Sequence, residues 1–236
     1  MAKIGVLHVT TTKKPPCRTK VRIDSFNLAE AGFVSGLPVI ATQQLNGFTL
    51  VLQDIQSKES ICKTSKLIHV GLNRDKPTIT VNFAKNFFPN GLSTGDFLAT
   101  KYEKGVIIAR KLPYAQKYYV VTTQNYGAFL RLNGAWLSDA GFIPDDIVLV
   151  LSKPGNIILR AWKDNTKSHI EIVKFARTHK CQIMQVQANQ HITYFDLNDY
   201  ILSRANFEAH DIIGVHYEYG TITLFKPDLK PLGFER

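Results

Sequence analysis

Several features that define common protein classes are scarce or missing in this 236-residue sequence. Its three cysteines, Cys17, Cys62 and Cys181, are an odd number without the paired spacing of a zinc site, and they predict free thiols in a reducing compartment. No apolar run approaches the ~20 residues that a membrane-spanning helix needs, and the polar residues 10–18 interrupt the N-terminus where a secretory signal would be apolar. These absences predict a cytoplasmic protein that does not enter a membrane.

Residue sets that mark catalytic sites are also missing. The sequence has no glycine-rich phosphate loop that ends in Lys-Ser or Lys-Thr, and its seven histidines are scattered. The adjacent Asp145 and Asp146 are typical of a turn before a strand. We therefore expect no catalytic residue, no metal and no cofactor, and we do not expect the chain to be an enzyme.

What the sequence does contain is a short pattern that recurs four times. The clearest copies are residues 21–52 and 129–162, and each reads as a strand, a short apolar segment, an Ala-Gly-Phe triplet and then two strands joined by a glycine-containing turn. Residues 79–108 and 192–224 follow the same order more loosely. An additional strand, here called the lead strand, precedes each copy. Such internal repeats determine the fold, so they take precedence over local signals.

One repeat has too few short strands to bury a closed core, whereas two repeats can cover each other's apolar faces. We therefore predict a mainly β protein with short helices, built as two tandem pseudo-twofold barrels. The predicted domains are a basic barrel at 1–115 and a near-neutral barrel at 116–236, each with two repeats. One continuous four-repeat assembly and an ordinary β-sandwich remain as alternatives. The residues expected in the core by their repeat position are Phe33, Phe142, Phe207 and, beside them, Trp136.

The third repeat resembles a known family. Residues 129–142, Phe-Leu-Arg-Leu-Asn-Gly-Ala-Trp-Leu-Ser-Asp-Ala-Gly-Phe, with Val148 and the Gly-Asn-Ile-Ile-Leu of 155–159, are similar to the core of the SymE-type toxin domain. That domain is similar to the AbrB/MazE group of swapped-hairpin DNA-binding folds. In the family, two chains normally exchange hairpins to form one barrel. The resemblance implies that the two tandem barrels are AbrB-like swapped-hairpin barrels, that the protein binds DNA, and that it acts in a toxin–antitoxin system or in transcription regulation.

Positive charge is concentrated in the first half of the chain. The net charge is +10, and residues 1–115 hold 16 Lys and Arg against 7 Asp and Glu, whereas residues 116–236 hold 13 against 12. Such asymmetry indicates a polyanionic partner for the basic half. In AbrB-like folds the DNA contacts lie around the first core strand and the loop before it. The resemblance implies this role for Lys13, Lys14, Arg18, Lys20, Arg22, Arg74, Lys76 and Lys85.

Together these features predict a nucleic-acid-binding protein, regulatory or SymE-toxin-like, that attaches electrostatically through its N-terminal half. Duplex DNA is favoured over RNA, and the protein is a monomer or a homodimer. A solvated basic face without a ligand is the simpler alternative. Two other functions also remain open. One is a protein-interaction scaffold or inhibitor from a mobile element or phage, with a protein partner bound by residues 116–236. The other is a SymE-like ribonuclease.

Overall fold

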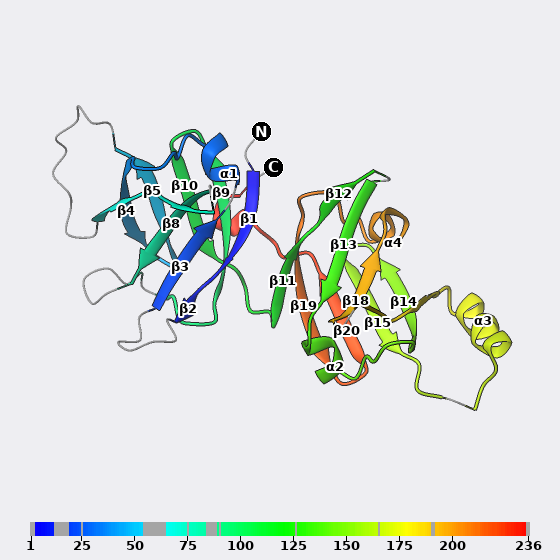
Figure 1. The fold of residues 1–236 in the computed structure, drawn as a ribbon. Helices are drawn as coiled ribbons and strands as arrows, with labels where there is room; N and C mark the ends of the chain where they lie inside the picture. Colours follow the sequence, from blue (N-terminus) through cyan, green and yellow to red (C-terminus); the bar gives the residue numbers. More distant parts are fainter. Residues whose placement is uncertain are drawn as a thin grey trace. The chain divides into compact units, whose positions relative to one another are not determined.

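The structure is a computed structural model, and the residues that it describes are 3–11, 19–24, 26–53, 65–74, 76–83, 89, 91–125, 127–164, 166–189 and 192–234. The chain divides into two units (Figure 1). Unit 1 comprises Met1–Tyr114 with Asp228–Arg236, and unit 2 comprises Ala115–Pro227. The predicted domains placed residues 228–236 with the second half, whereas in the structure these residues group with unit 1.

Unit 1 contains two antiparallel sheets. The larger sheet has the strand order β1-β9-β10-β5-β4-β6, and the smaller sheet has the order β2-β3-β8-β7. In the larger sheet the strands are β1 Lys3–His8, β9 Phe97–Glu103, β10 Val106–Lys111, β5 Gly47–Leu52, β4 Pro38–Gln44 and β6 Ser65–His69. In the smaller sheet they are β2 Thr10–Thr11, β3 Thr19–Asp24, β8 Lys76–Asn82 and β7 Gly71–Asn73. Unit 1 also holds the helix α1 Phe26–Glu30 and the 3-10 turn η1 Lys230–Leu232.

Unit 2 repeats this arrangement. Its larger sheet has the order β11-β19-β20-β15-β14-β16, and its smaller sheet has the order β12-β13-β18-β17. The larger sheet consists of β11 Lys117–Val120, β19 Ile212–Glu218, β20 Thr221–Phe225, β15 Asn156–Ala161, β14 Ile147–Lys153 and β16 Gln182–Gln185. The smaller consists of β12 Thr122–Gln124, β13 Gly127–Asn133, β18 Ile192–Leu197 and β17 Gln187–Asn189. Its helices are α2 Trp136–Asp139, α3 His169–Thr178 and α4 Asp199–Arg204.

The prediction of a mainly β protein with short helices is confirmed. Between described residues, the strand pairings form four open antiparallel sheets, and the closure of each unit into a barrel stays a prediction. No helix in the described ranges is long and apolar enough to cross a membrane.

Each lead strand crosses from the larger sheet into the smaller one at a valine. The four valines are at most 2% exposed: Val9, Val70, Val121 and Val186. In unit 1, the Val9 N–H donates to the Asp96 carbonyl and the Val9 carbonyl accepts from the Gly95 N–H, both at 2.9 Å. The residue that donates to the valine carbonyl has a left-handed backbone in every repeat, namely Gly36, Gly95, Asp145 and His210. The four repeats therefore share one turn geometry.

The lead strands are exchanged between the two repeats of a unit. Strand β1 precedes the first repeat but pairs with β9 of the second, and β6 precedes the second but pairs with β4 of the first. In unit 2, β11 pairs with β19 and β16 pairs with β14 in the same way.

The last strands of the two repeats meet at the centre of each larger sheet, as β5 with β10 and β15 with β20. The register sets Thr49 opposite Ile108 and Ile158 opposite Thr223. Each of these four residues lies three positions after the left-handed residue of its own hairpin turn. Equivalent residues therefore face each other, as an approximate twofold axis requires.

The Ala-Gly-Phe triplets end the short helices. The middle residue is left-handed in the three clear cases, Gly32, Gly141 and Asn206, and so is Gly91 at the same place in the second repeat. Glycine and asparagine adopt this conformation at low cost, which explains the residue choice. The alanine carbonyl accepts an N–H from the hairpin turn of the opposite repeat at 2.8 Å, in the pairs Gly105 to Ala31, Gly220 to Ala140 and Gly155 to Ala205.

The third residue of each triplet enters the core. Phe33 and Phe142 are 0% exposed, Phe207 is 1% exposed, and Trp136 is 8% exposed. The prediction that these four residues belong to the core is confirmed. Burial of one such side chain contributes roughly 1.5–3 kcal/mol.

Three repeats add an ion pair at the turn before their long strand. Each pair joins an aspartate to a lysine: Asp96 to Lys111 (2.9 Å), Asp146 to Lys163 (2.7 Å) and Asp211 to Lys226 (2.9 Å). The aspartates also accept backbone N–H groups three residues earlier, from Ser93, Ile143 and Glu208. In the first repeat, Leu37 and Leu52 stand where Asp96 and Lys111 stand in the second, and both leucines pack against the core.

Helix α3 lies in unit 2 between the third and fourth repeats of the sequence pattern. Ser168 and Glu171 form a capping box: the Ser168 N–H donates to the Glu171 carboxylate (2.8 Å), and the Glu171 N–H donates to the Ser168 hydroxyl (3.4 Å). The helix packs Ile172 and Ala176 against Leu149 of the larger sheet.

Candidate nucleic-acid interface

The smaller sheet of unit 1 has one buried face and one solvent face. Side chains alternate between the faces of a strand, and the buried set is fully inaccessible: Val21, Ile23, Ile79 and Val81 are all 0% exposed. The side chains at the alternate positions of β3 and β8 therefore lie on the outward face. The register pairs them across the two strands, as Lys20 with Asn82, Arg22 with Thr80 and Asp24 with Thr78. We call this outward surface, together with the β7–β8 turn, the basic face.

Four of the eight predicted binding residues lie in described parts of the chain. Lys20 and Arg22 are on β3, Lys76 is the first residue of β8, and Arg74 is in the turn between β7 and β8 with a left-handed backbone (φ 47°). All four therefore belong to the basic face. The other four predicted residues, Lys13, Lys14, Arg18 and Lys85, lie outside the described residues.

The cations are spread along the sheet instead of converging on one point. Lys20 lies opposite Asn82, which is six residues from Lys76 on β8. At the rise of an antiparallel strand, the rows of Lys20 and Lys76 are about 20 Å apart. Phosphates of one DNA strand recur every ~3.4 Å along the helix axis, so the two ends of the basic face match phosphates about six nucleotides apart.

Arg22 at the centre of the face is only partly neutralised. Its Nε lies 2.6 Å from a carboxylate oxygen of Asp24, and the two side chains are 43% and 36% exposed. Asp24 also accepts from the Thr78 hydroxyl. Exposed ion pairs contribute about 0–1 kcal/mol and exchange readily. A contact through Nε leaves the terminal nitrogens of the guanidinium available to another acceptor.

Lys76 is oriented by an aromatic ring and not by an acid. Its ammonium lies 4.3 Å from the ring centroid of Phe26, which is 65% exposed. A cation–π contact restrains the side chain and preserves its charge. With the residues that the structure describes, Lys20, Arg74 and Lys76 form no ion pair. The described residues of the basic face thus present four cations and one carboxylate, and Asp75, between Arg74 and Lys76 in the sequence, lies outside the described residues.

Sequence reasoning missed the neutral polar groups between these cations. Thr10 lies opposite Lys20 on β2, Asn73 lies opposite Lys76 on β7, and Thr80 and Asn82 lie on the same side of β8. Hydroxyl and amide groups donate hydrogen bonds to phosphate oxygens without adding charge. The period-two alternation with Ile79 and Val81 was the signal that could have identified Thr80 and Asn82.

The corresponding face of unit 2 is neutral at its centre. Arg131 of β13 lies opposite Asp196 of β18, and the two form a bidentate pair with both N–O distances at 2.6 Å. The hydrogen bonds to Asp196 raise the pKa of Arg131 above its usual value. The guanidinium also lies 4.6 Å from the ring centroid of Tyr194 and 5.7 Å from that of Phe129. Arg131 is therefore committed to partners within unit 2.

A catalytic pattern that sequence reasoning overlooked lies in unit 1. Residues 91–95 read Gly-Leu-Ser-Thr-Gly, which matches the Gly-x-Ser-x-Gly of a nucleophile elbow. That motif requires a sharp turn from a strand into a helix. Here the strand β9 begins at Phe97, directly after the turn, and the Ser93 N–H donates to the Asp96 carboxylate at 2.6 Å. The segment is a capped turn before a strand and lacks the geometry of an elbow.

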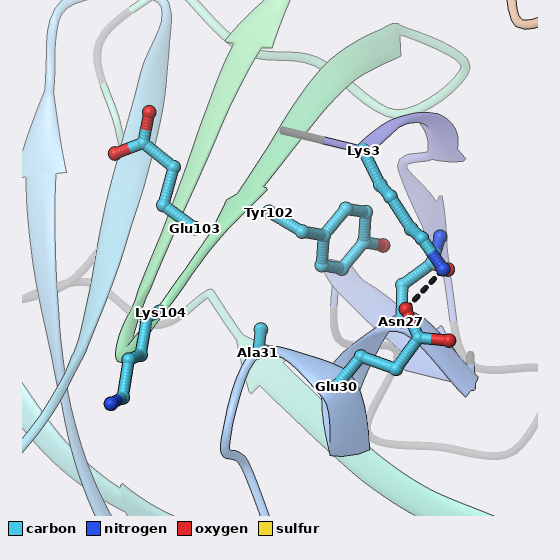
Figure 2. A pocket seen from close by; sticks show the side chains of 7 residues that line it. All are labelled: Lys3, Asn27, Glu30, Ala31, Tyr102, Glu103 and Lys104. Carbon is cyan, nitrogen blue, oxygen red and sulfur yellow. Dashed lines mark hydrogen bonds and ion pairs between the residues drawn. The ribbon is translucent and has the colours of Figure 1, made fainter. Parts of the chain in front are cut away.

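Unit 1 also has a pocket of about 370 Å³ among β1, α1 and the β9–β10 turn (Figure 2). Its charged groups balance, because Lys3 pairs with Glu30, and Lys104 and Glu103 stand side by side in the chain. Tyr102 points from β9 toward Lys3, and its burial raises the pKa of the phenol. Within the described ranges, no three His, Cys, Asp or Glu side chains form a group that could hold a metal.

Comparisons with protein-family models, with curated proteins and with solved structures found no match for this chain. The ligand of the basic face therefore has to be inferred from the residues of the face itself.

Proposed function

We propose that the chain binds nucleic acid, with duplex DNA preferred over RNA, through the basic face of unit 1. The observation that carries this proposal is the unbalanced charge of the face, whose described residues include the cations Lys20, Arg22, Arg74 and Lys76 against the carboxylate of Asp24. Polyphosphate backbones are the common partners of such a surface. By the ranges of the structure, unit 1 holds 18 Lys and Arg against 9 Asp and Glu, and unit 2 holds 11 against 10.

Attachment is electrostatic in this proposal. Each cation that contacts a phosphate releases a condensed counterion, so affinity falls steeply as salt rises. Lys13, Lys14, Arg18 and Lys85 contribute further phosphate contacts. Threonine and asparagine side chains of the face fix the register on the backbone, and sequence is read weakly because phosphate contacts carry no base information.

The same proposal includes the architecture and the cellular role. Each unit is a pseudo-twofold, AbrB-like swapped-hairpin barrel, and the chain is a regulatory or SymE-toxin-like protein of the cytoplasm. Two observations support the architecture. The lead strands are exchanged between repeats in both units, and equivalent residues meet at the centre of each larger sheet.

A salt titration with matched charge removals tests the binding site. The test variant is Lys20→Gln with Lys76→Gln, and the control is Lys153→Gln with Lys174→Gln, which removes the same charge from exposed positions of unit 2. Binding to a labelled duplex of arbitrary sequence is followed by fluorescence anisotropy at rising salt. We expect the test variant to lower the log–log salt slope by about 1.8, roughly 0.9 per lost contact, and the control to keep the wild-type slope.

The other readings give different results in the same experiment. Equal slopes for both double variants would mean that the basic face is a solvated surface without a ligand. Tighter binding to single-stranded RNA than to the duplex would overturn the preference for DNA. Shortening of the RNA during the titration would instead establish the ribonuclease.

A protein-interaction scaffold is the second candidate, and the neutral face of unit 2 supports it. Phe129, Arg131 and Tyr194 lie together on that face, and Ile192 beside them is 53% exposed. Aromatic and arginine side chains are enriched at protein interfaces. We expect Ile192→Asp to release a co-purifying protein and to leave the salt slope for DNA unchanged. Retention of that protein would exclude this face as its binding site.

A further inference from the structure

Unit 2 contains an apolar cavity of about 460 Å³ that nucleic-acid binding does not use. The cavity lies between the larger sheet and the C-terminal end of α3. Its floor includes Leu151 of β14 and Ile158 of β15, and its wall includes Trp162 and Phe175. The volume is within the ~300–1,000 Å³ of small-molecule sites, which are mostly apolar with a few polar groups.

The cavity exists because α3 covers the sheet incompletely. Only Ile172 and the small Ala176 of this helix are buried, and both pack against Leu149. Phe175 turns toward Trp162 instead, with ring centroids 5.1 Å apart and an interplanar angle of 63°. These two rings form an edge-to-face wall beside the half-buried Leu151 and Ile158. An aromatic ring that enters here contacts apolar groups on two sides.

The Asp164 carboxylate at the cavity already accepts hydrogen bonds from the N–H and the hydroxyl of Thr166, and the polar side chains of the lining are Arg160, Lys163, Asp164, His179 and Cys181. Lys163 is occupied, because its ammonium donates to Asp146 and to the Gly141 carbonyl, both at 2.7 Å. Arg160 is exposed and forms no ion pair with the described residues, so its guanidinium is the cation available to a ligand. The His179 Nδ1 lies 2.8 Å from the Phe175 carbonyl and donates to it, which leaves Nε2 as an acceptor in the neutral ring.

We propose that this cavity binds a small aromatic carboxylate. The ring of the ligand lies against Trp162 and Phe175 over Leu151 and Ile158, and its carboxylate pairs with the Arg160 guanidinium. Arginine binds carboxylates through two parallel hydrogen bonds, which gives affinity and orientation together. Unit 2 is then a ligand-binding module, a function separate from the proposed nucleic-acid site of unit 1.

Calorimetric titration of the full chain tests this site with 2-naphthoate and its neutral analogue 2-naphthamide. We expect one saturable site per chain and at least about tenfold tighter binding of the carboxylate, as a charge-assisted pair provides. Arg160→Gln should remove that preference and leave the amide affinity unchanged. The control Arg204→Gln, which removes the same charge from α4, should behave like the wild type.

A second variant tests the location. Ile158→Trp fills the cavity and should abolish binding of both compounds, while quenching of Trp162 fluorescence should accompany binding in the wild type. If that variant unfolds, Leu151→Phe reports the same loss with a smaller change in volume. Absence of saturable binding by either compound up to about 1 mM, or equal affinity for the two, would overturn the proposal. A persistent preference in Arg160→Gln would do so as well.

Discussion

The smaller sheets of the two units are built alike and differ in charge at their centre. Arg22 in unit 1 and Arg131 in unit 2 occupy the middle of the ladder that joins the two repeats, and they face Thr80 and Asp196. Two hydrogen bonds hold Arg131 on Asp196, whereas Arg22 contacts only an acid of its own strand. The buried residues that pair in this ladder are aliphatic or aromatic in both units. Outward positions can therefore change charge while the inward face keeps the fold.

The turn before the long strand provides the strongest test of the difference between repeats. Asp211 is 2% exposed and pairs with Lys226, while the first repeat has two leucines at these places. We expect Lys226→Leu to lower the free energy of unfolding by about 3 kcal/mol, because it leaves a buried carboxylate without its cation. Adding Asp211→Leu should recover most of this loss, since an apolar pair then replaces the ion pair. Urea unfolding measures both.

The same substitution in unit 1 serves as the comparison. Asp96 is 18% exposed, so Lys111→Leu should cost less than Lys226→Leu. Equal costs at the two positions would show that burial of the aspartate does not set the energy of the pair.

Alkaline pH should lower the stability of unit 2 more than that of unit 1, because unit 2 contains the buried Tyr118. Burial raises the pKa of this phenol to about 12, and Val6 occupies the corresponding place in unit 1, three residues before the valine where the lead strand changes sheets. The folded-state pKa lies above the unfolded value near 10, so stability is complete below pH 10 and falls as pH rises toward 12. At about pH 11 the loss should be roughly 1.4 kcal/mol. Tyr118→Phe should remove this part of the pH dependence in urea melts, and an unchanged profile would contradict the assignment.

Exchanging the residues opposite Arg22 and Arg131 should weaken DNA binding by unit 1 and strengthen DNA binding by unit 2. Thr80→Asp places a carboxylate across from Arg22, and we expect about tenfold weaker DNA binding with a salt slope reduced by roughly one to two. Asp196→Thr frees Arg131 and should increase the affinity of unit 2 for DNA. If Thr80→Asp binds as the wild type does, then Arg22 takes no part in the interface.

We expect the smallest effect when basic residues of the face are replaced and the free energy of unfolding is measured. Lys20→Gln and Lys76→Gln should each change the free energy of unfolding by less than about 0.5 kcal/mol, because these side chains are exposed or half-buried and lack an acidic partner among the described residues. A larger loss at Lys76 would mean that its contact with Phe26 has a structural role.

Local chemistry made much of this fold predictable. The repeats were recognisable because a glycine or asparagine at the end of a helix is followed by a phenylalanine in three of them. Few residues adopt the left-handed backbone at the first position, and few positions in a fold accept a large ring. The turn at Asp145 also followed from local residue preference. Such signals depend on neighbours in sequence, which the sequence displays directly.

Pairing between distant residues could not be predicted. The partner of β1 is β9, which lies about ninety positions away in the sequence, and neither strand has a sequence feature that identifies the other as its neighbour. The acid opposite Arg131 becomes apparent only once the register of β13 and β18 is known. For the same reason Asp146 was interpreted as a turn residue alone, although Lys163 follows the last strand of its repeat and pairs with it.

The order of synthesis affects when unit 1 can be completed, because its last segment is at the C-terminal end of the sequence. Residues 228–236 group with unit 1, yet a ribosome makes them after all of unit 2. At 5–20 residues per second, the elongating chain holds unit 1 without its last segment for about 10 s. During that time the site that receives Phe234, which is 3% exposed in the finished protein, has no occupant from its own chain. Completion of the N-terminal unit is therefore coupled to translation of the C-terminal one.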